Sequence, residues 1–172
     1  MSTIDKEWLK TNRVLAKYNE GAAEVSDDLL VKKDSGVTSL GEVVKVRRVL
    51  TASYCHTLGS IGRLKEVGGD ANFYGTAITS LEGLAVGGDL VVGDDHLLLL
   101  TALGSVGGRV YVGHHKGSLD FFRMVIANWT RYYAGRPERA AFDILKTAKT
   151  TLHYTMIRAA LENKLQQGAQ HD

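Results

Sequence analysis

The chain has 172 residues, of which 44% are hydrophobic and 23% charged, so it is long enough for one domain with a sizeable core. Its formal net charge of +2 excludes the strong electrostatic field that is typical of DNA-, RNA- or membrane-binding proteins. The single cysteine, Cys55, excludes an internal disulfide. Together with a polar N-terminus and only short apolar runs, it predicts a cytoplasmic protein that does not enter membranes.

Residues 1–36 predict an N-terminal helical cap. One face of a helix over residues 3–20 carries the apolar side chains Ile4, Trp8, Leu15 and Tyr18. Ser2 and Asp5 form a candidate capping pair, and Gly21 supplies a C-terminal stop. A second break follows at residues 26–28.

Residues 37–117 contain an internal repeat of about twenty residues, and 16 of the 19 glycines lie between Gly36 and Gly117. Four segments align, at residues 37–50, 58–73, 78–92 and 97–112. Each has an apolar residue at every third position, then, except in the first copy, a Gly-Gly pair, then a strand-like alternation. The aligned valines Val46, Val67, Val86 and Val106 are 21, 19 and 20 residues apart. A period this short predicts stacked coils rather than separately folded units.

The pattern predicts the conformation of each coil. Spacing of three indicates a turn-like or 3₁₀-like arm, and spacing of two indicates one strand per coil, near residues 49–52, 70–73, 89–92 and 109–112. The Gly-Gly pair offers a sharp turn with positive φ between arm and strand. We expect these strands to be parallel and in register, with the four aligned valines buried in one column.

The frame Leu-x-x-Leu-x-x-Leu-x-x-Val-Gly-Gly-Asp-Leu-x-Val resembles leucine-rich repeats, and specifically the degenerate repeats of receptor-type L domains and related bacterial proteins. The resemblance covers residues 37–117 and implies an α/β fold, a short solenoid with a parallel sheet of about four strands. The sequence departs from the family in lacking the usual turn-forming asparagine. It also departs in having Arg47-Arg48 where the later copies have Gly-Gly.

Residues 118–172 predict a C-terminal helical cap or extension. A helix that starts at Ser118 and ends at Gly135 carries one stripe of Phe122, Ile126, Trp129 and Tyr133, and Pro137 begins a second, longer helix. Solenoids need such caps because their end coils are otherwise exposed. The alternative is a homodimer seam that uses the aromatic residues together with Leu152 and Met156.

Polar residues that follow the expected strands form a second candidate site. The alignment places Asp94 beside His114, Asp95 beside His115 and His96 beside Lys116, with Cys55 and His56 on the same edge. Imidazole and carboxylate are normal zinc ligands, but the spacing matches no established metal motif. We therefore expect no metal, no cofactor and no catalytic residue, and a buried Cys55; a metal-dependent enzyme remains the alternative.

The outward positions of the four strands are the preferred partner-binding surface. They form two columns, Val49, Asp70, Asp89 and Arg109, and then Thr51, Asn72, Val91 and Tyr111. Repeat proteins commonly bind partners on such a face, and aromatic and arginine side chains are favoured anchors. The candidate contact residues are Asp70, Asn72, Asp89, Val91, Arg109 and Tyr111.

These observations predict a non-enzymatic protein-binding module, an adaptor or an inhibitor that covers a macromolecular partner, as expected of a small bacterial or phage protein. The alternative is a nucleic-acid-associated protein that uses the basic C-terminal part, with Arg123, Arg131, Arg136, Arg139, Lys146 and Lys149. The low net charge makes this alternative the weaker one.

Overall fold

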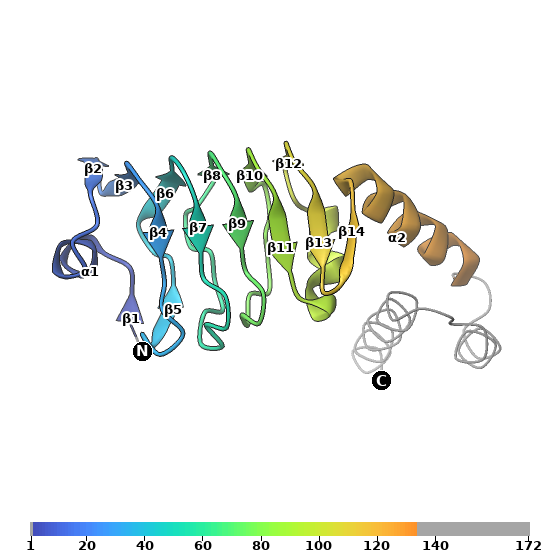
Figure 1. The fold of residues 1–172 in the computed structure, drawn as a ribbon, viewed down its shortest axis with the longest axis horizontal. Helices are drawn as coiled ribbons and strands as arrows, with labels where there is room; N and C mark the ends of the chain where they lie inside the picture. The colour runs from blue at the N-terminus through green and yellow to red at the C-terminus, as the bar shows by residue number, and fades with distance from the viewer. Residues whose placement is uncertain (1, 134–172) are drawn as a thin grey trace, which may run out of the picture. The chain divides into compact units, whose positions relative to one another are not determined.

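Each repeat folds into one coil that adds a short strand to each of two sheets, and the coils stack into a β-solenoid of about four turns (Figure 1). This computed structural model describes residues 2–133. The chain divides into two compact units, Met1–Leu119 and Asp120–Asp172. The solenoid lies in the first unit.

Two six-stranded sheets run along the solenoid, and every coil adds one strand to each. Sheet I has the order β12-β10-β8-β6-β3-β2, with β2 Ala16–Asn19, β3 Ala22–Val25, β6 Val43–Val46, β8 Glu66–Val67, β10 Ala85–Val86 and β12 Ser105–Val106. Sheet II has the order β14-β13-β11-β9-β7-β4, with β4 Leu29–Leu30, β7 Leu50–Thr51, β9 Ala71–Asn72, β11 Leu90–Val92, β13 Val110–Val112 and β14 His115–Gly117. Neighbouring strands are parallel except at β2 and β14, which pair antiparallel with β3 and β13.

The expected strands and their register are confirmed. Leu50 pairs with Ala71, Ala71 with Leu90, and Leu90 with Val110. Val46, Val67 and Val86 are buried in one column, at most 2% exposed. Val106 continues this column but is only half-buried, and its strand β12 lies at the edge of sheet I.

The expected fold is confirmed in part: the parallel solenoid is present, but the described residues are mostly β rather than α/β, and the coils form two sheets instead of one sheet of about four strands. The arm before each Gly-Gly pair is turn-like, as expected, with bonds such as Leu64 N–H to Ile61 O at 3.1 Å. Only its last two residues form a strand, because their backbone groups bond to the coils on either side. A 3₁₀ helix, η1 Asp94–Thr101, occurs in the last coil. The described α-helices are α1 Lys6–Thr11 and α2 Leu119–Tyr133.

The N-terminal helix is much shorter than the predicted span of residues 3–20. Asp5 caps α1 by accepting a hydrogen bond from the backbone N–H of Trp8, at 2.8 Å, whereas Ser2 belongs to β1 Ser2–Thr3, which pairs with β5 Val37–Ser39. The chain then forms the β2–β3 hairpin. Leu15 is 72% exposed, so the predicted apolar face ends with the helix.

The N-terminal part also contains a coil that the repeat alignment missed. In β3 and β4, Val25 pairs with Val46 and Leu29 with Leu50, so residues 22–31 form the first coil of the solenoid. Gly21 does not stop a helix. Glu20 and Gly21 both have positive φ, 49° and 74°, and form the two-residue turn of the β2–β3 hairpin.

The Gly-Gly pairs allow close stacking of the coils, not the expected positive φ. A Cβ atom at Gly68, Gly87 or Gly107 would overlap the backbone carbonyl of the preceding coil. Gly87 N–H donates to Val67 O at 2.8 Å, and the same bond recurs at each step. Positive φ occurs instead at another corner, for example at Gly62 (59°).

This stacking predicts that Gly87→Ala destabilises the protein by roughly 1–3 kcal/mol, because the added methyl group has no free space between the coils. The free energy of unfolding, measured by urea titration of the full chain, tests this. Gly59→Ala is the matched control, since its Cβ would meet its nearest neighbour, Ala77 O, at 3.7 Å and its φ is not positive. Equal stability of the two variants would contradict the stacking argument.

Candidate partner-binding surface

The first predicted column is largely occupied by bonds between coils. Asp70 Oδ1 accepts the backbone N–H of Asp89 at 2.7 Å, and Asp89 Oδ1 accepts that of Arg109 at 2.7 Å. Asp28 Oδ1 accepts the N–H of Val49 at 3.1 Å in the first step. Asp70 and Asp89 thus lie where predicted, but each uses a carboxylate oxygen to hold the next coil.

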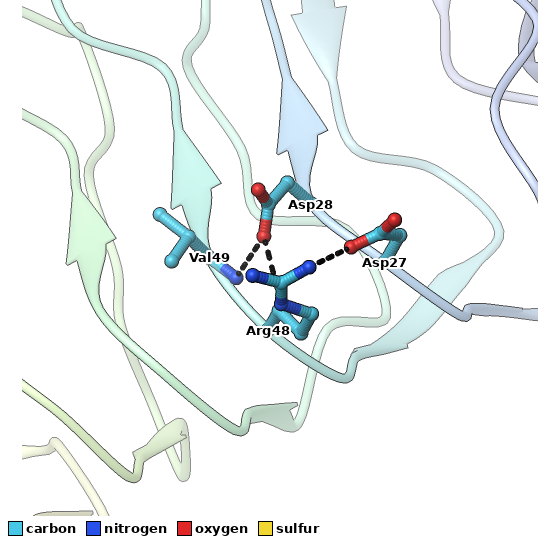
Figure 2. A network of polar contacts seen from close by, with 4 residues as sticks. All are labelled: Asp27, Asp28, Arg48 and Val49. Atoms are coloured by element: carbon cyan, nitrogen blue, oxygen red, sulfur yellow. Dashed lines mark hydrogen bonds and ion pairs between the residues drawn. The ribbon is translucent and has the colours of Figure 1, made fainter.

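The first step of the solenoid replaces the glycine contacts with an ion-pair network (Figure 2). Arg48 Nη1 lies 2.7 Å from Asp27 Oδ1, and Arg48 Nε lies 3.7 Å from Asp28 Oδ1. These side chains are 54–65% exposed, so each pair contributes little stability by itself. The network accounts for the departure of Arg47-Arg48 from the Gly-Gly pattern, since the preceding coil has Ser26-Asp27 at the same level.

The second predicted column forms one row across sheet II. Consecutive strands pair Thr51 with Asn72, Asn72 with Val91, and Val91 with Tyr111. Leu30 extends the row at one end and Lys116 at the other. The outward row is therefore Leu30, Thr51, Asn72, Val91, Tyr111 and Lys116. Asn72 also accepts the backbone N–H of Tyr74 at 3.0 Å, which fixes the orientation of its amide.

Sheet I presents a different row. Lys17, Glu24, Lys45 and Glu66 face one another on successive strands, followed by Ala85 and Ser105. The charges alternate in sign, and Lys45 Nζ lies 2.7 Å from Glu66 Oε1. A row of alternating charges that contains an ion pair is typical of a solvated surface. The row on sheet II has no such internal pairing of charges among its six residues.

The predicted histidine edge is not assembled as expected. After Val112 the chain turns back, so His115 lies opposite Val112 and Lys116 opposite Tyr111 in an antiparallel pair. The expected stacking of residue 95 beside 115 and of 96 beside 116 is therefore wrong. Within the described residues, no group of three or more His, Cys, Asp or Glu side chains could hold a metal ion. Cys55 is fully buried, as expected.

The C-terminal candidates fall outside the description given by the structure. The structure does not describe the side chains of Trp129, Arg131, Tyr132 and Tyr133. It also does not describe the residues beyond 133, which include Arg136, Arg139, Lys146, Lys149, Leu152 and Met156. Of the predicted basic residues, Arg123 is described and half-buried. Among the described helices, none is both long and apolar enough to cross a membrane.

Comparison of the chain with protein-family models, with curated proteins and with solved structures finds no match. The assignment of a surface therefore depends on the chemistry of the two sheets alone.

Sequence reasoning missed the coil at residues 22–31 and, with it, Leu30 and the network around Arg48. A signal was present, because Val25-x-x-x-Leu29-x-Val31 has the same spacing as Val46-x-x-x-Leu50-x-Ala52. This coil lacks the Gly-Gly pair and also, with Asn19 at the position of Leu40, the apolar residue at every third position.

The bonds between coils predict that Asp89→Ala lowers the free energy of unfolding by about 1 kcal/mol, because the backbone N–H of Arg109 loses its acceptor. Asp89→Asn keeps an acceptor oxygen and should recover most of this loss. Chemical unfolding of both variants measures the difference. If Asp89→Ala is as stable as the unchanged protein, the carboxylate is free for another role.

Proposed function

We propose that the protein is a non-enzymatic binding module whose sheet II holds another protein. The observation that carries this proposal is the contrast between the sheets. The row on sheet I carries charges of alternating sign, with an ion pair between Lys45 and Glu66, whereas the outward row on sheet II offers Thr51, Asn72, Val91 and Tyr111 without charge. Uncharged and aromatic groups cost less to desolvate than charged groups and therefore favour a protein interface.

Rigidity supports the same proposal. The strands below the row are bonded to each other at every level, and Asn72 is held by Tyr74, so a partner orders few groups on binding. Tyr111 lies near the end of the row beside Lys116. Arg109 precedes Tyr111 by two residues and lies on the same face. Tyrosine and arginine are common interface anchors.

The surface suits an adaptor or an inhibitor that covers a partner's surface. Kinship with leucine-rich repeats and a bacterial or phage origin are also part of this proposal. Both depend on the sequence pattern of residues 37–117. A cytoplasmic location fits the free, buried thiol of Cys55, since reducing compartments preserve such thiols.

The proposal predicts that Val91→Lys combined with Tyr111→Ala removes binding. The lysine places an unpaired charge in the centre of the row, and loss of an aromatic anchor costs about 2 kcal/mol or more in affinity. Tagged protein captures partners from a lysate of the source organism, and quantitative mass spectrometry compares the variant with the unchanged protein. Proteins enriched by the unchanged chain should be lost with the variant.

Ala85→Lys is the matched control, because Ala85 is also a half-buried outward residue of the same coil but lies on sheet I. It should capture the same proteins as the unchanged chain, and the melting temperatures of all variants should agree within a few degrees. If the double variant retains every partner and truncation after residue 135 loses them, binding resides in the C-terminal part instead.

A further inference from the structure

An antiparallel strand covers one edge of each sheet, at opposite ends of the solenoid. Antiparallel β2 covers the N-terminal edge of sheet I, and antiparallel β14 covers the C-terminal edge of sheet II. β4 is therefore left as the N-terminal edge strand of sheet II. The N–H groups of Leu29 and Val31 bond to Val49 O and Thr51 O of the next coil, so the backbone groups of Leu30 between them point to the open side.

A groove of about 420 Å³ lies along this edge. One wall is β4, and the other is the connection from α1 to β2, which is held to the first coil by the bond from Ser26 N–H to Leu15 O at 2.8 Å. Trp8, Val14, Leu15 and Leu30 give the groove apolar side chains, and Leu15 and Leu30 are 72% and 57% exposed. Such exposure of large apolar side chains at an open strand edge suits a partner strand.

The charges that line the groove are unequal. Asp27 and Asp28 both face Arg48, which neutralises part of their charge (Figure 2). Arg13 and Lys32 also line the groove. Within residues 2–133, neither of these two side chains forms an ion pair. The groove thus has two cations available for a partner, and the open edge of β4 offers backbone groups that a polypeptide strand, unlike a nucleic acid backbone, can pair with.

Arg13 occupies this position at a conformational cost. Its φ of 57° is left-handed, and its N–H bonds to Lys10 O while Val14 N–H bonds to Leu9 O, which is the helix-ending arrangement where glycine is preferred. An arginine there gives up backbone stability that Gly would supply.

From these features we infer that the groove binds an extended, acidic segment of a partner protein, which adds to sheet II as a strand beside β4. Backbone bonds to Leu30 hold the segment, alternate apolar side chains pack on Trp8 and Leu15, and its carboxylates face Arg13 and Lys32. This inference goes beyond the binding proposed for the outward row. Its test variants leave Val91 and Tyr111 unchanged, so either proposal can fail alone.

The test uses a random dodecapeptide library displayed on phage and selected on the full-length protein. The expected consensus alternates β-branched residues with glutamate or aspartate. Synthetic peptides of the consensus should lose binding when alternate backbone amides are N-methylated, because strand addition needs those N–H groups. No enrichment, a basic or uncharged consensus, or tolerance of N-methylation would each overturn the inference.

Three variants locate the site. Arg13→Gly removes a cation while favouring the local backbone, so weaker binding cannot be ascribed to unfolding. Lys32→Glu should shift the binding preference by about tenfold from the acidic consensus peptide to a peptide that has lysine in place of the acidic residues. The acidic peptide then loses one attraction and gains one repulsion. Lys33→Glu makes the same charge change at an exposed neighbour that does not line the groove, and should leave binding unchanged. Equal effects of the two lysine variants would place the peptide elsewhere.

Discussion

Backbone contact between successive coils is the constraint on which the rest of this solenoid depends. At the corner between the sheets the coils approach so closely that Gly68, Gly87 and Gly107 have no space for a side chain. The same corner carries backbone-to-backbone hydrogen bonds at each level, and the N–H groups of Val49, Asp89 and Arg109 also donate to an aspartate carboxylate of the preceding coil. This contact fixes the register of both sheets, and the register in turn aligns the buried columns and the outward row.

The ends of the solenoid follow a different rule from its middle. Internal coils bond to a coil on each side, whereas an end coil needs some other partner for its backbone groups. The chain supplies one antiparallel strand for sheet I at the start and one for sheet II at the finish. The covered edges therefore lie at opposite ends of the two sheets. β4 keeps an open edge that a second polypeptide is able to pair with.

The sequence predicted the repeated part of the fold because burial repeats there with a regular period. The strands at Leu50, Ala71, Leu90 and Val110 follow from apolar alternation after the glycine pairs. The second strand of each coil was missed because two residues, such as Ala85-Val86, are too few to show a period. The predicted length of the N-terminal helix, residues 3–20, was too long because apolar residues at the start of the β2–β3 hairpin matched helical spacing. The roles of Asp70 and Asp89 depend on which backbone N–H lies nearby, and one-dimensional spacing does not contain that information.

The ion-pair network of the first step has a consequence for how the chain can change in length. The steps to Gly87 and Gly107 use the same glycine contacts and the same aspartate bond, so a coil of this type is a repeatable module. Duplication of such a module adds one residue to the outward row and lengthens it by about 4.8 Å. The step to Arg48 is unlike the others, because its contacts require Asp27 and Asp28 in the coil before it. Growth is thus confined to the glycine part, and the groove beside β4 stays the same size in solenoids of any length.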